Sequence, residues 1–254
     1  MFKSYTEIYE TRGGMYHDAM AQWPKARKQE FEALVQSAEI TAEVPVIVDV
    51  PSGGGYISDY LPAGSKLISV DPSARFLHAG GQESAHQVIC APHAAIPLPD
   101  ASVDVVLSLA GLHHLDDHQS AFAEWFRLLR PGGVLVIGDG LEGSATTQFL
   151  DEVVGRFNSM GHTGNYLSSQ DTELLESIGF DLVEAAEKPY SWVFADRSAM
   201  LEFCRTLFCM DRAVDDAVLV SEIERTVGFY EGPGECHLRW ALMFITARKP
   251  AAGS

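Results

Sequence analysis

Short apolar runs alternate with helix-like stretches along the chain between Val46 and Asp139. The runs VIVDV, KLISVD, HQVIC, SVDVVLSL and GVLVIGD are strand-like, whereas AFAEWFRLLR places its aromatic residues at helical spacing. This alternation predicts β-α-β units, which build a parallel sheet through right-handed crossovers. We therefore expect an α/β protein with a doubly wound sheet.

The remaining segments complete this sheet and decorate it. Two more strand-like runs, FDLVEAAEKPYSWVF and HLRWALMFITARK, give an expected sheet of seven mostly parallel strands with helices on both faces. Helices are expected near 198–210 and 215–228. A chain of 254 residues fits a single domain. We divide it into an N-terminal helical lid, a cofactor-binding core and two inserts after strands five and six: residues 1–43, 44–140, 141–168 and 197–234.

Composition excludes several kinds of partner and site. A formal net charge of −17 would repel a nucleic acid backbone. The apolar runs are too short to span a membrane, and MFKSYTEIYE lacks the apolar region of a secretory signal, so we expect a cytoplasmic protein. The spacing of the four cysteines matches neither a zinc ribbon nor a redox pair. We expect free, buried thiols and no metal site.

The segment VIVDVPSGGGYISDYL predicts a strand ending in Asp49, a tight glycine loop and an amphipathic helix. Glycines let a ligand approach the backbone, and a helix N-terminus favours a negative ligand group. Asp71 ends the next strand at about the 20-residue offset where an acid accepts hydrogen bonds from ribose hydroxyls. Taken singly, Asp49 fits a loop acid and Asp71 a turn former. Their joint spacing favours a nucleoside-binding loop.

A dinucleotide-binding loop would place its third glycine where this chain has Ser58. The pattern instead resembles the class I S-adenosylmethionine-dependent methyltransferases of the small-molecule type, whose first motif is an acid followed by G-x-G-x-G. The runs IPLPDASVDVVLS and RLLRPGGVLVIGD are similar to the LPFPDGSFDVV and RVLKPGG segments of that family and follow in the same order. The resemblance covers roughly residues 44–140 and implies S-adenosylmethionine as the cofactor.

The resemblance also implies a role for each matching residue. Gly53 and Gly55 would lie against the methionine part of the cofactor. Asp49 would orient the loop, or the amino group of the cofactor through water, and Asp71 would bind the ribose hydroxyls. The other implied contacts are Pro72 and Phe76 against the adenine, Ala91, Pro92 and His93 along its edge, and Leu109 beneath the cofactor. The chain departs from the family at two positions. Pro51 replaces the first glycine of the loop, and Pro92 replaces an adenine-binding aspartate.

Methyl transfer from a sulfonium mainly requires a nucleophile held in line and the exclusion of water. An acidic acceptor also gains from a base, for which histidine has a suitable pKa. His113 and His114 follow strand four, at the carboxyl edge where ligands bind in open α/β sheets. We expect one of them to act as a base or to contact the acceptor; the alternative is that both pack the following turn. His162 and Tyr166 are further candidates for acceptor contact.

The lid and the two inserts are expected to form the acceptor pocket, since they are rich in aromatic residues such as Tyr16. We predict an enzyme that methylates oxygen or activated carbon of a small molecule. One alternative is methylation of an acid carried by an acyl carrier protein, docked through Lys25, Arg27 and Lys28. Another is a non-catalytic protein that binds S-adenosylmethionine. The sequence leaves the oligomeric state open.

Overall fold

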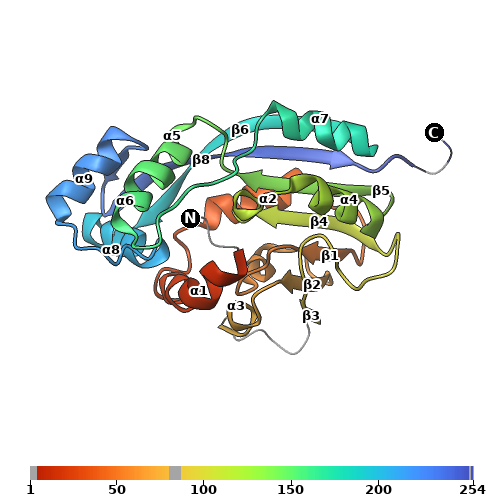
Figure 1. Cartoon of the computed structure of the whole chain (residues 1–254), viewed down its shortest axis with the longest axis horizontal. Helices are drawn as coiled ribbons and strands as arrows, with labels where there is room; N and C mark the ends of the chain where they lie inside the picture. Colours follow the sequence, from red (N-terminus) through yellow and green to blue (C-terminus); the bar gives the residue numbers. More distant parts are fainter. Residues whose placement is uncertain (1–4, 80–86, 252, 254) are drawn as a thin grey trace.

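The chain folds around one twisted sheet. The computed structural model describes residues 5–79, 87–251 and 253 (Figure 1). In these residues the strand order is β3-β2-β1-β4-β5-β8-β6, and β7 pairs with β8. The strands are β1 Val46–Asp49, β2 Lys66–Asp71, β3 Gln87–Cys90, β4 Val103–Leu109, β5 Leu129–Asp139, β6 Asp181–Phe194, β7 Phe229–Gly232 and β8 Glu235–Arg248.

The strand directions confirm the predicted doubly wound, mostly parallel sheet. Strands β1 to β5 pair in parallel, whereas β8 is inserted between β5 and β6 and runs antiparallel to both. The structure adds one strand to the predicted seven, because the end of the 197–234 insert forms β7 rather than a loop or helix. The sequence Gly232–Pro233–Gly234 makes a tight turn there, with Gly234 at a φ of 78°, and β7 folds back onto β8.

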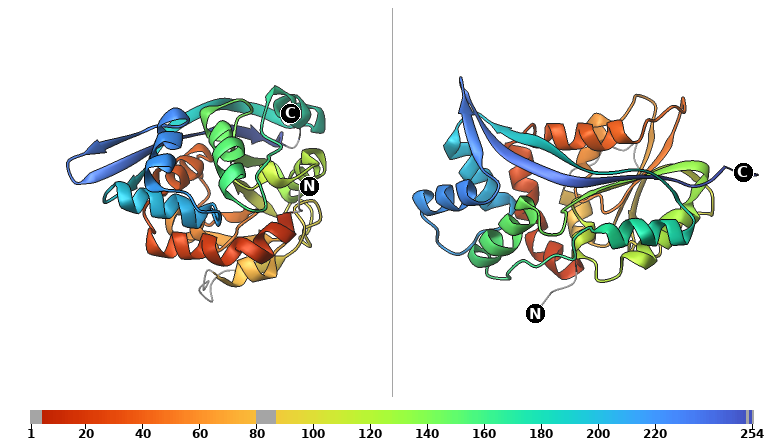
Figure 2. Two further views of the ribbon diagram at one scale, coloured as in Figure 1. Left: turned by 60° about the vertical axis from the view of Figure 1, so that its left-hand side comes forward. Right: turned by 90° about the horizontal axis from the view of Figure 1, so that it is seen from above.

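Helices cover both faces of the sheet, as predicted (Figure 2). Alternate side chains of a strand point to opposite faces, so Ile47 joins one core cluster and its neighbour Val48 joins the other. Helix α2 packs on the first face, and α4 and α7 pack on the second. The helices are α1 Tyr5–Gln22, α2 Lys28–Ser37, α3 Ala74–Ala79, α4 His118–Leu128, α5 Ala145–Gln148, α6 Gly155–Phe157, α7 Ser169–Ile178, α8 Arg197–Leu207 and α9 Asp216–Arg225.

The predicted helices of the second insert are confirmed as α8 and α9. Helix α7 ends at Gly179, which has a φ of 114° that an L side chain rarely adopts. The start of α7 is fixed by Ser168 and Asp171, which form a reciprocal capping box. In Figure 1, α1, α5, α6, α8 and α9 gather at the end of the sheet where β8 begins. Because β8 is antiparallel, this is the carboxyl end of the parallel strands.

The segment after the glycine loop differs from the prediction. The sequence predicts an amphipathic helix, but Tyr56–Tyr60 forms a single short 3-10 helix. Pro62 disfavours helical geometry at Leu61, which is extended at φ −77° and ψ 151°. The helix N-terminus that was expected to favour a negative ligand group is therefore only a short turn, and the loop itself must supply the contacts.

The cysteines are only partly as predicted. All four cysteines are free thiols, but only Cys204 and Cys236 are buried, while Cys90 is exposed. Among the described residues, no helix has both the length and the apolar character needed to cross a membrane.

The packing of α4 on the sheet gives a stability prediction. Phe122 is fully buried next to Trp125 and Leu135 in the second core cluster. We expect Phe122→Ala to lower the free energy of unfolding by about 3 to 5 kcal/mol, because the lost ring leaves a cavity. Val218 on α9 is 43% exposed, and Val218→Ala should change the free energy of unfolding by less than about 0.5 kcal/mol. Urea unfolding would measure both; equal losses would contradict the assigned core position of Phe122.

Candidate functional site

The glycine loop connects the ends of β1 and β2. Gly53 has a φ of 52°, and its backbone N–H donates to Oδ2 of Asp71 at 2.9 Å. A Cβ at Gly53 would lie 2.9 Å from the ring of Phe76, so a larger residue would collide there. Gly55 is also left-handed and starts the 3-10 helix. The loop thus depends on glycine where it passes Asp71 and Phe76.

Asp71 is a fully buried carboxylate with three hydrogen-bond donors. Besides Gly53, it accepts the N–H of Ser73 at 2.8 Å and the hydroxyl of Tyr5 at 2.8 Å. Burial raises the pKa of Asp71 to about 6, while these three hydrogen bonds oppose the rise. The Tyr5 hydroxyl occupies Oδ2, one of the two oxygens expected to accept hydrogen bonds from ribose.

Asp49 lies one strand away from Asp71 and is also buried. Burial, followed by the charge of Asp71, raises the pKa of Asp49 well above its ordinary value. Two carboxyl groups at neighbouring strand ends therefore compete to be ionised.

Helix α1 covers this pair of carboxyl groups with tyrosines. The ring of Tyr9 stacks on Phe76 with centroids 4.7 Å apart and planes 6° apart, and Tyr16 meets the edge of Phe76 at 5.2 Å. Phe76, which the sequence predicts against an adenine, here contacts α1. Beneath these rings lies a small cavity. Of the predicted cofactor contacts, it is lined by Asp49, Pro51, Gly53, Phe76 and Leu109.

The other predicted cofactor contacts lie outside this lining. Gly55 is at the far end of the loop, and Asp71 is covered by Tyr5. The N–H of Ala91 bonds the carbonyl of Asp71 at 3.2 Å, and Pro92 is exposed. His93 is buried with its ring 5.0 Å from that of Tyr5, and burial lowers the pKa of His93 to about 4. Pro72 is half-buried beside Cys90.

A second, larger cavity adjoins the first. Both cavities are lined by Tyr9, Tyr16, Arg27 and Ala110, so these residues form a common wall. The second cavity extends beneath the inserts. Its other linings include His113, His114, Asp139, His162, Leu150, Val154, Trp192, Phe208, Trp240 and Leu242.

His113 belongs to a short 3-10 helix, Leu112–His114, that follows β4. Its Nδ1 lies 2.6 Å from Oδ1 of Asp139, which ends the adjacent strand β5. The carboxylate also accepts the backbone N–H groups of Leu112, His113 and Gly140. Burial alone would raise the pKa of Asp139, but His113 and these donors hold it below its ordinary value. Asp139 thus stays ionised and keeps the proton of His113 on Nδ1.

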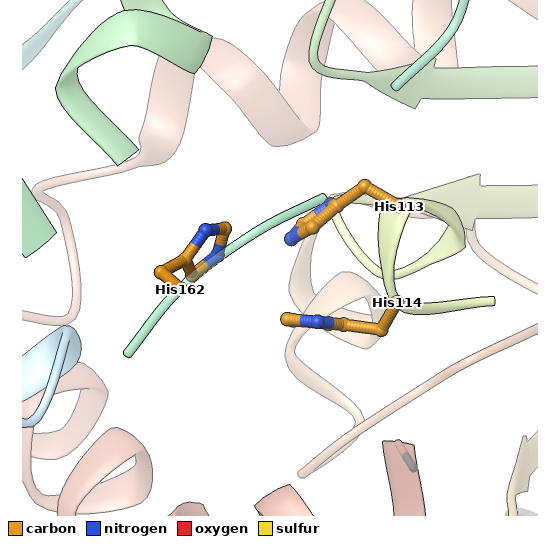
Figure 3. Close-up of side chains that lie close together, drawn as sticks. All are labelled: His113, His114 and His162. Carbon is orange, nitrogen blue, oxygen red and sulfur yellow. The ribbon is translucent and has the colours of Figure 1, made fainter. Parts of the chain in front are cut away.

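His114 and His162 bring two more imidazoles to the same place (Figure 3). The rings of His113 and His114 lie 4.1 Å apart, and that of His162 is 5.5 Å from His113 and 5.6 Å from His114. Burial, followed by the neighbouring imidazoles, lowers the pKa of His114 well below its ordinary value. Burial also lowers the pKa of His162, although Asp151 opposes this. Three imidazoles therefore face one another, with His114 and His162 held in the neutral form.

Tyr166, another predicted acceptor contact, supports this cluster from behind. Its hydroxyl donates to Oδ1 of Asp151 at 2.5 Å, and its ring stacks on that of His113 at 5.7 Å. The same Asp151 oxygen lies 3.2 Å from Nδ1 of His162. Tyr166 is thus placed behind the imidazoles, whereas His162 lines the cavity itself.

A buried ion pair forms part of the common wall. Arg27 is 3% exposed and pairs with Glu30, which is fully buried and also accepts the indole N–H of Trp192 at 2.6 Å. The hydroxyl of Tyr16 accepts another N–H of Arg27. Arg27 therefore cannot belong to the surface patch that the sequence suggested for carrier docking, because its charge is directed inward and matched by Glu30.

Several site residues were not predicted from the sequence. Asp139 ends an apolar strand at the carboxyl edge just as Asp49 and Asp71 do, and this position could have revealed it. No such signal marks Arg27, Glu30, Trp192 and Trp240, because these residues meet only through long-range packing. Tyr5 and Tyr9 belong to the aromatic residues of the lid that were expected around the acceptor pocket, but no sequence signal predicts their contacts with Asp71 and His114.

The core of the chain matches a known protein family. Residues 48–137 match the family model described as a methyltransferase domain. This segment runs from β1 through β5 and includes the glycine loop, Asp71 and His113. The chain carries a class I S-adenosylmethionine-dependent methyltransferase domain. The inserts and helix α1 lie outside the matched segment.

Individual relatives resemble this domain over part of their length. The chain is 31% identical over 140 residues to a probable S-adenosylmethionine-dependent methyltransferase of Mycolicibacterium smegmatis, covering 54% of this chain and 52% of that protein. It is 29% identical over 127 residues to a malonyl-[acyl-carrier protein] O-methyltransferase of Yersinia pestis, covering 49% and 47%. The alignments thus span about half the length of these curated relatives.

The fold of the methyltransferase domain and its decorations is also found in a solved structure. Phosphoethanolamine N-methyltransferase 2 of Haemonchus contortus, in complex with phosphomonomethylethanolamine and S-adenosylhomocysteine, superposes with a TM-score of 0.66 at 14% identity. The match covers 98% of this chain and 60% of that protein. At this identity the likeness shows the fold, so assignment of the acceptor must rest on the cavity.

The raised pKa of Asp71 gives a pH prediction. Ribose hydroxyls donate to a carboxylate, so protonation of Asp71 removes an acceptor and should weaken binding as the pH falls through about 6. By calorimetry, the affinity for S-adenosylhomocysteine should fall up to about tenfold per pH unit below that value. Asp71→Asn should bind weakly at every pH and flatten the profile, whereas Asp59→Asn, an exposed acid nearby, should behave as wild type. A wild-type profile that is flat between pH 5 and 8 would remove Asp71 from the ligand site.

The contact between Tyr5 and Asp71 gives a second binding prediction. In the described structure, the Tyr5 hydroxyl uses the oxygen that a ribose hydroxyl would need. A hydrogen bond to a charged group contributes about 1.5 to 3 kcal/mol, so removing this competitor should tighten ligand binding about tenfold or more. We expect this gain for Tyr5→Phe with S-adenosylhomocysteine at pH 8, where Asp71 is ionised. Unchanged or weaker binding would show that Tyr5 and the ribose do not compete.

Proposed function

We propose that this protein transfers the methyl group of S-adenosylmethionine to an oxygen or activated carbon of a small-molecule acceptor. The observation that carries the proposal is the pair of adjoining cavities. One lies against the glycine loop, the other contains the His113–Asp139 pair, and both share a wall at Ala110 and the tyrosines of α1. A donor and an acceptor bound side by side would need this arrangement.

The residues of the smaller cavity fit the nucleoside part of the cofactor. Leu109 and Phe76 supply apolar surface to its lining. Asp71 lies outside the lining, covered by Tyr5, and offers a buried carboxylate beside a loop that depends on glycine. We assign ribose binding to Asp71 and the methionine side to the loop around Gly53. When bound, the cofactor supplies an activated methyl group on a positively charged sulfur. The domain has to position the acceptor and remove its proton.

His113 is suited to be the base. Because Asp139 accepts the Nδ1 proton, Nε2 keeps its lone pair for a proton from the acceptor. Asp139 is a positioning residue: it fixes the tautomer and stabilises the imidazolium that forms. His114 lies beside His113 and contacts the Tyr9 hydroxyl at 3.3 Å, which places it at the boundary between the two cavities.

The lining of the larger cavity favours a flat, apolar acceptor. Trp192 and Trp240 stack with centroids 4.2 Å apart, and Phe208 stacks on both of them. Leu150 and Val154 complete the apolar surface. An aromatic or polyketide-like acceptor with one acidic hydroxyl or carbon would bury its ring here and direct that group toward His113. In this proposal, helix α1 and the two inserts act as the lid that excludes water.

Methylation of a carrier-bound acid is the second candidate, favoured by the name of the Yersinia pestis relative. Inward burial of Arg27 leaves only Lys25 and Lys28 of the suggested docking patch at the surface, which weakens this candidate. A labelled-methyl screen against small phenols and against carrier-bound acids would separate the two. Binding of S-adenosylhomocysteine without transfer to either set would favour a non-catalytic role instead.

The His113–Asp139 pair gives a kinetic prediction. We expect His113→Ala to lower kcat about 100-fold, since a positioned base contributes about that factor or more. Asp139→Asn should lower kcat similarly, because an asparagine no longer fixes the tautomer. Affinity for S-adenosylhomocysteine should stay within about threefold of wild type in both. His237→Ala, which removes a histidine paired with Glu235 on β8, serves as the control and should keep full activity. Normal turnover of both variants would show that His113 is not a base and that catalysis depends only on how the acceptor is positioned.

A further inference from the structure

Three histidines meet at the inner end of the larger cavity. His113 and His114 come from the turn after β4, and His162 comes from the segment between α6 and α7 (Figure 3). One ring nitrogen from each lies within 4.8 Å of those of the other two. Neither the cofactor nor an apolar acceptor accounts for three converging imidazoles.

We propose that His113, His114 and His162 together bind one divalent transition-metal ion. Imidazole nitrogen is a preferred ligand of Zn²⁺, Fe²⁺, Co²⁺ and Ni²⁺, whereas Mg²⁺ and Ca²⁺ prefer oxygen. Three histidines are a complete protein ligand set for a catalytic ion that keeps a further position open.

Each histidine has a polar partner behind it, as ligands of metal ions usually do. Asp139 holds Nδ1 of His113, and Asp151 lies 3.2 Å from Nδ1 of His162. The Tyr9 hydroxyl lies 3.3 Å from Nε2 of His114. The two carboxylates leave the opposite nitrogens of His113 and His162 for an ion. They also supply negative charge that offsets the ion and the nearby guanidinium of Arg12.

The spacing requires only a small adjustment. Three nitrogens bound to one ion at about 2.1 Å lie roughly 3.4 Å apart in tetrahedral geometry, so a pair 4.8 Å apart must approach by about 1.4 Å. His162 is the ligand placed to move. It belongs to neither a helix nor a strand, and a Cβ at the adjacent Gly161 would meet open space.

An ion held there would face the acceptor. The same three histidines line the larger cavity, so its open position would point among the aromatic residues. An oxygen donor such as a phenol hydroxyl would bind that position, and the ion would lower the pKa of the hydroxyl. This part of the inference rests on the proposed function, and it assigns acceptor activation to the ion rather than to His113 as free base.

The test uses tag-free protein dialysed against a chelator and titrated with Co²⁺, whose visible absorption reports imidazole coordination. We expect one ion per chain, displaced by Zn²⁺. His162→Ala should weaken binding at least 100-fold, and Asp139→Asn should weaken it about 10- to 100-fold. His237→Ala, which also removes a histidine paired with a carboxylate, should bind as wild type. Circular dichroism would verify that the variants fold.

The possible outcomes separate this inference from the proposed function. Absence of a Co²⁺ spectrum, or equal binding by all variants, would overturn the metal site and leave a base role for His113 intact. Binding with full methyl transfer by the metal-free protein would overturn acceptor activation by the ion. Loss of transfer on chelation, restored by added ion, supports it. The proposed function fails only if S-adenosylhomocysteine does not bind or no acceptor is methylated, whatever the metal titration gives.

Discussion

Three strands end in a buried carboxyl group at the same edge of the sheet, and the site depends on these groups. Asp49, Asp71 and Asp139 end β1, β2 and β5, where an apolar strand gives way to a loop. A buried carboxylate without donors costs several kcal/mol, so the following loops must turn backbone N–H groups toward it. Asp71 thereby organises the glycine loop, and Asp139 organises the turn that carries His113. The conformations of these two loops therefore follow from the need to supply hydrogen-bond donors to a buried carboxylate.

Helix α1 and the inserts complete what these carboxylates begin. The hydroxyl of Tyr5 reaches Asp71, the ring of Tyr9 reaches Phe76, and Arg27 with Glu30 ties the segment after α1 to Trp192 on β6. Breaking a buried ion pair by removing one partner leaves an uncompensated charge, so this link strongly fixes where the N-terminal segment lies. The wall between the cavities is therefore anchored both to the strand β6 and to the residues beside the glycine loop.

The parts that could be predicted are those encoded in local patterns. The strands and helices follow from apolar periodicity, and Asp71 and His113 follow from their positions at strand ends. The helix after Gly55 was mispredicted because its apolar pattern outweighed the effect of Pro62. Strand β7 was missed since its four residues carry little periodicity. His162 meets His113 only through the path of an irregular segment, and Tyr5 meets Asp71 only after the chain has folded back, so no local pattern encodes either contact.

The common wall has a thermodynamic consequence. Tyr9 and Tyr16 lie on one helix and border both cavities, so a ligand that shifts this helix on one side changes the free energy of binding on the other. Such coupling is reciprocal: if bound cofactor changes the affinity for the acceptor by some factor, bound acceptor changes the affinity for the cofactor by the same factor. The coupling therefore stabilises or destabilises the complex that contains both cofactor and acceptor. The order in which the two ligands bind affects only the rates.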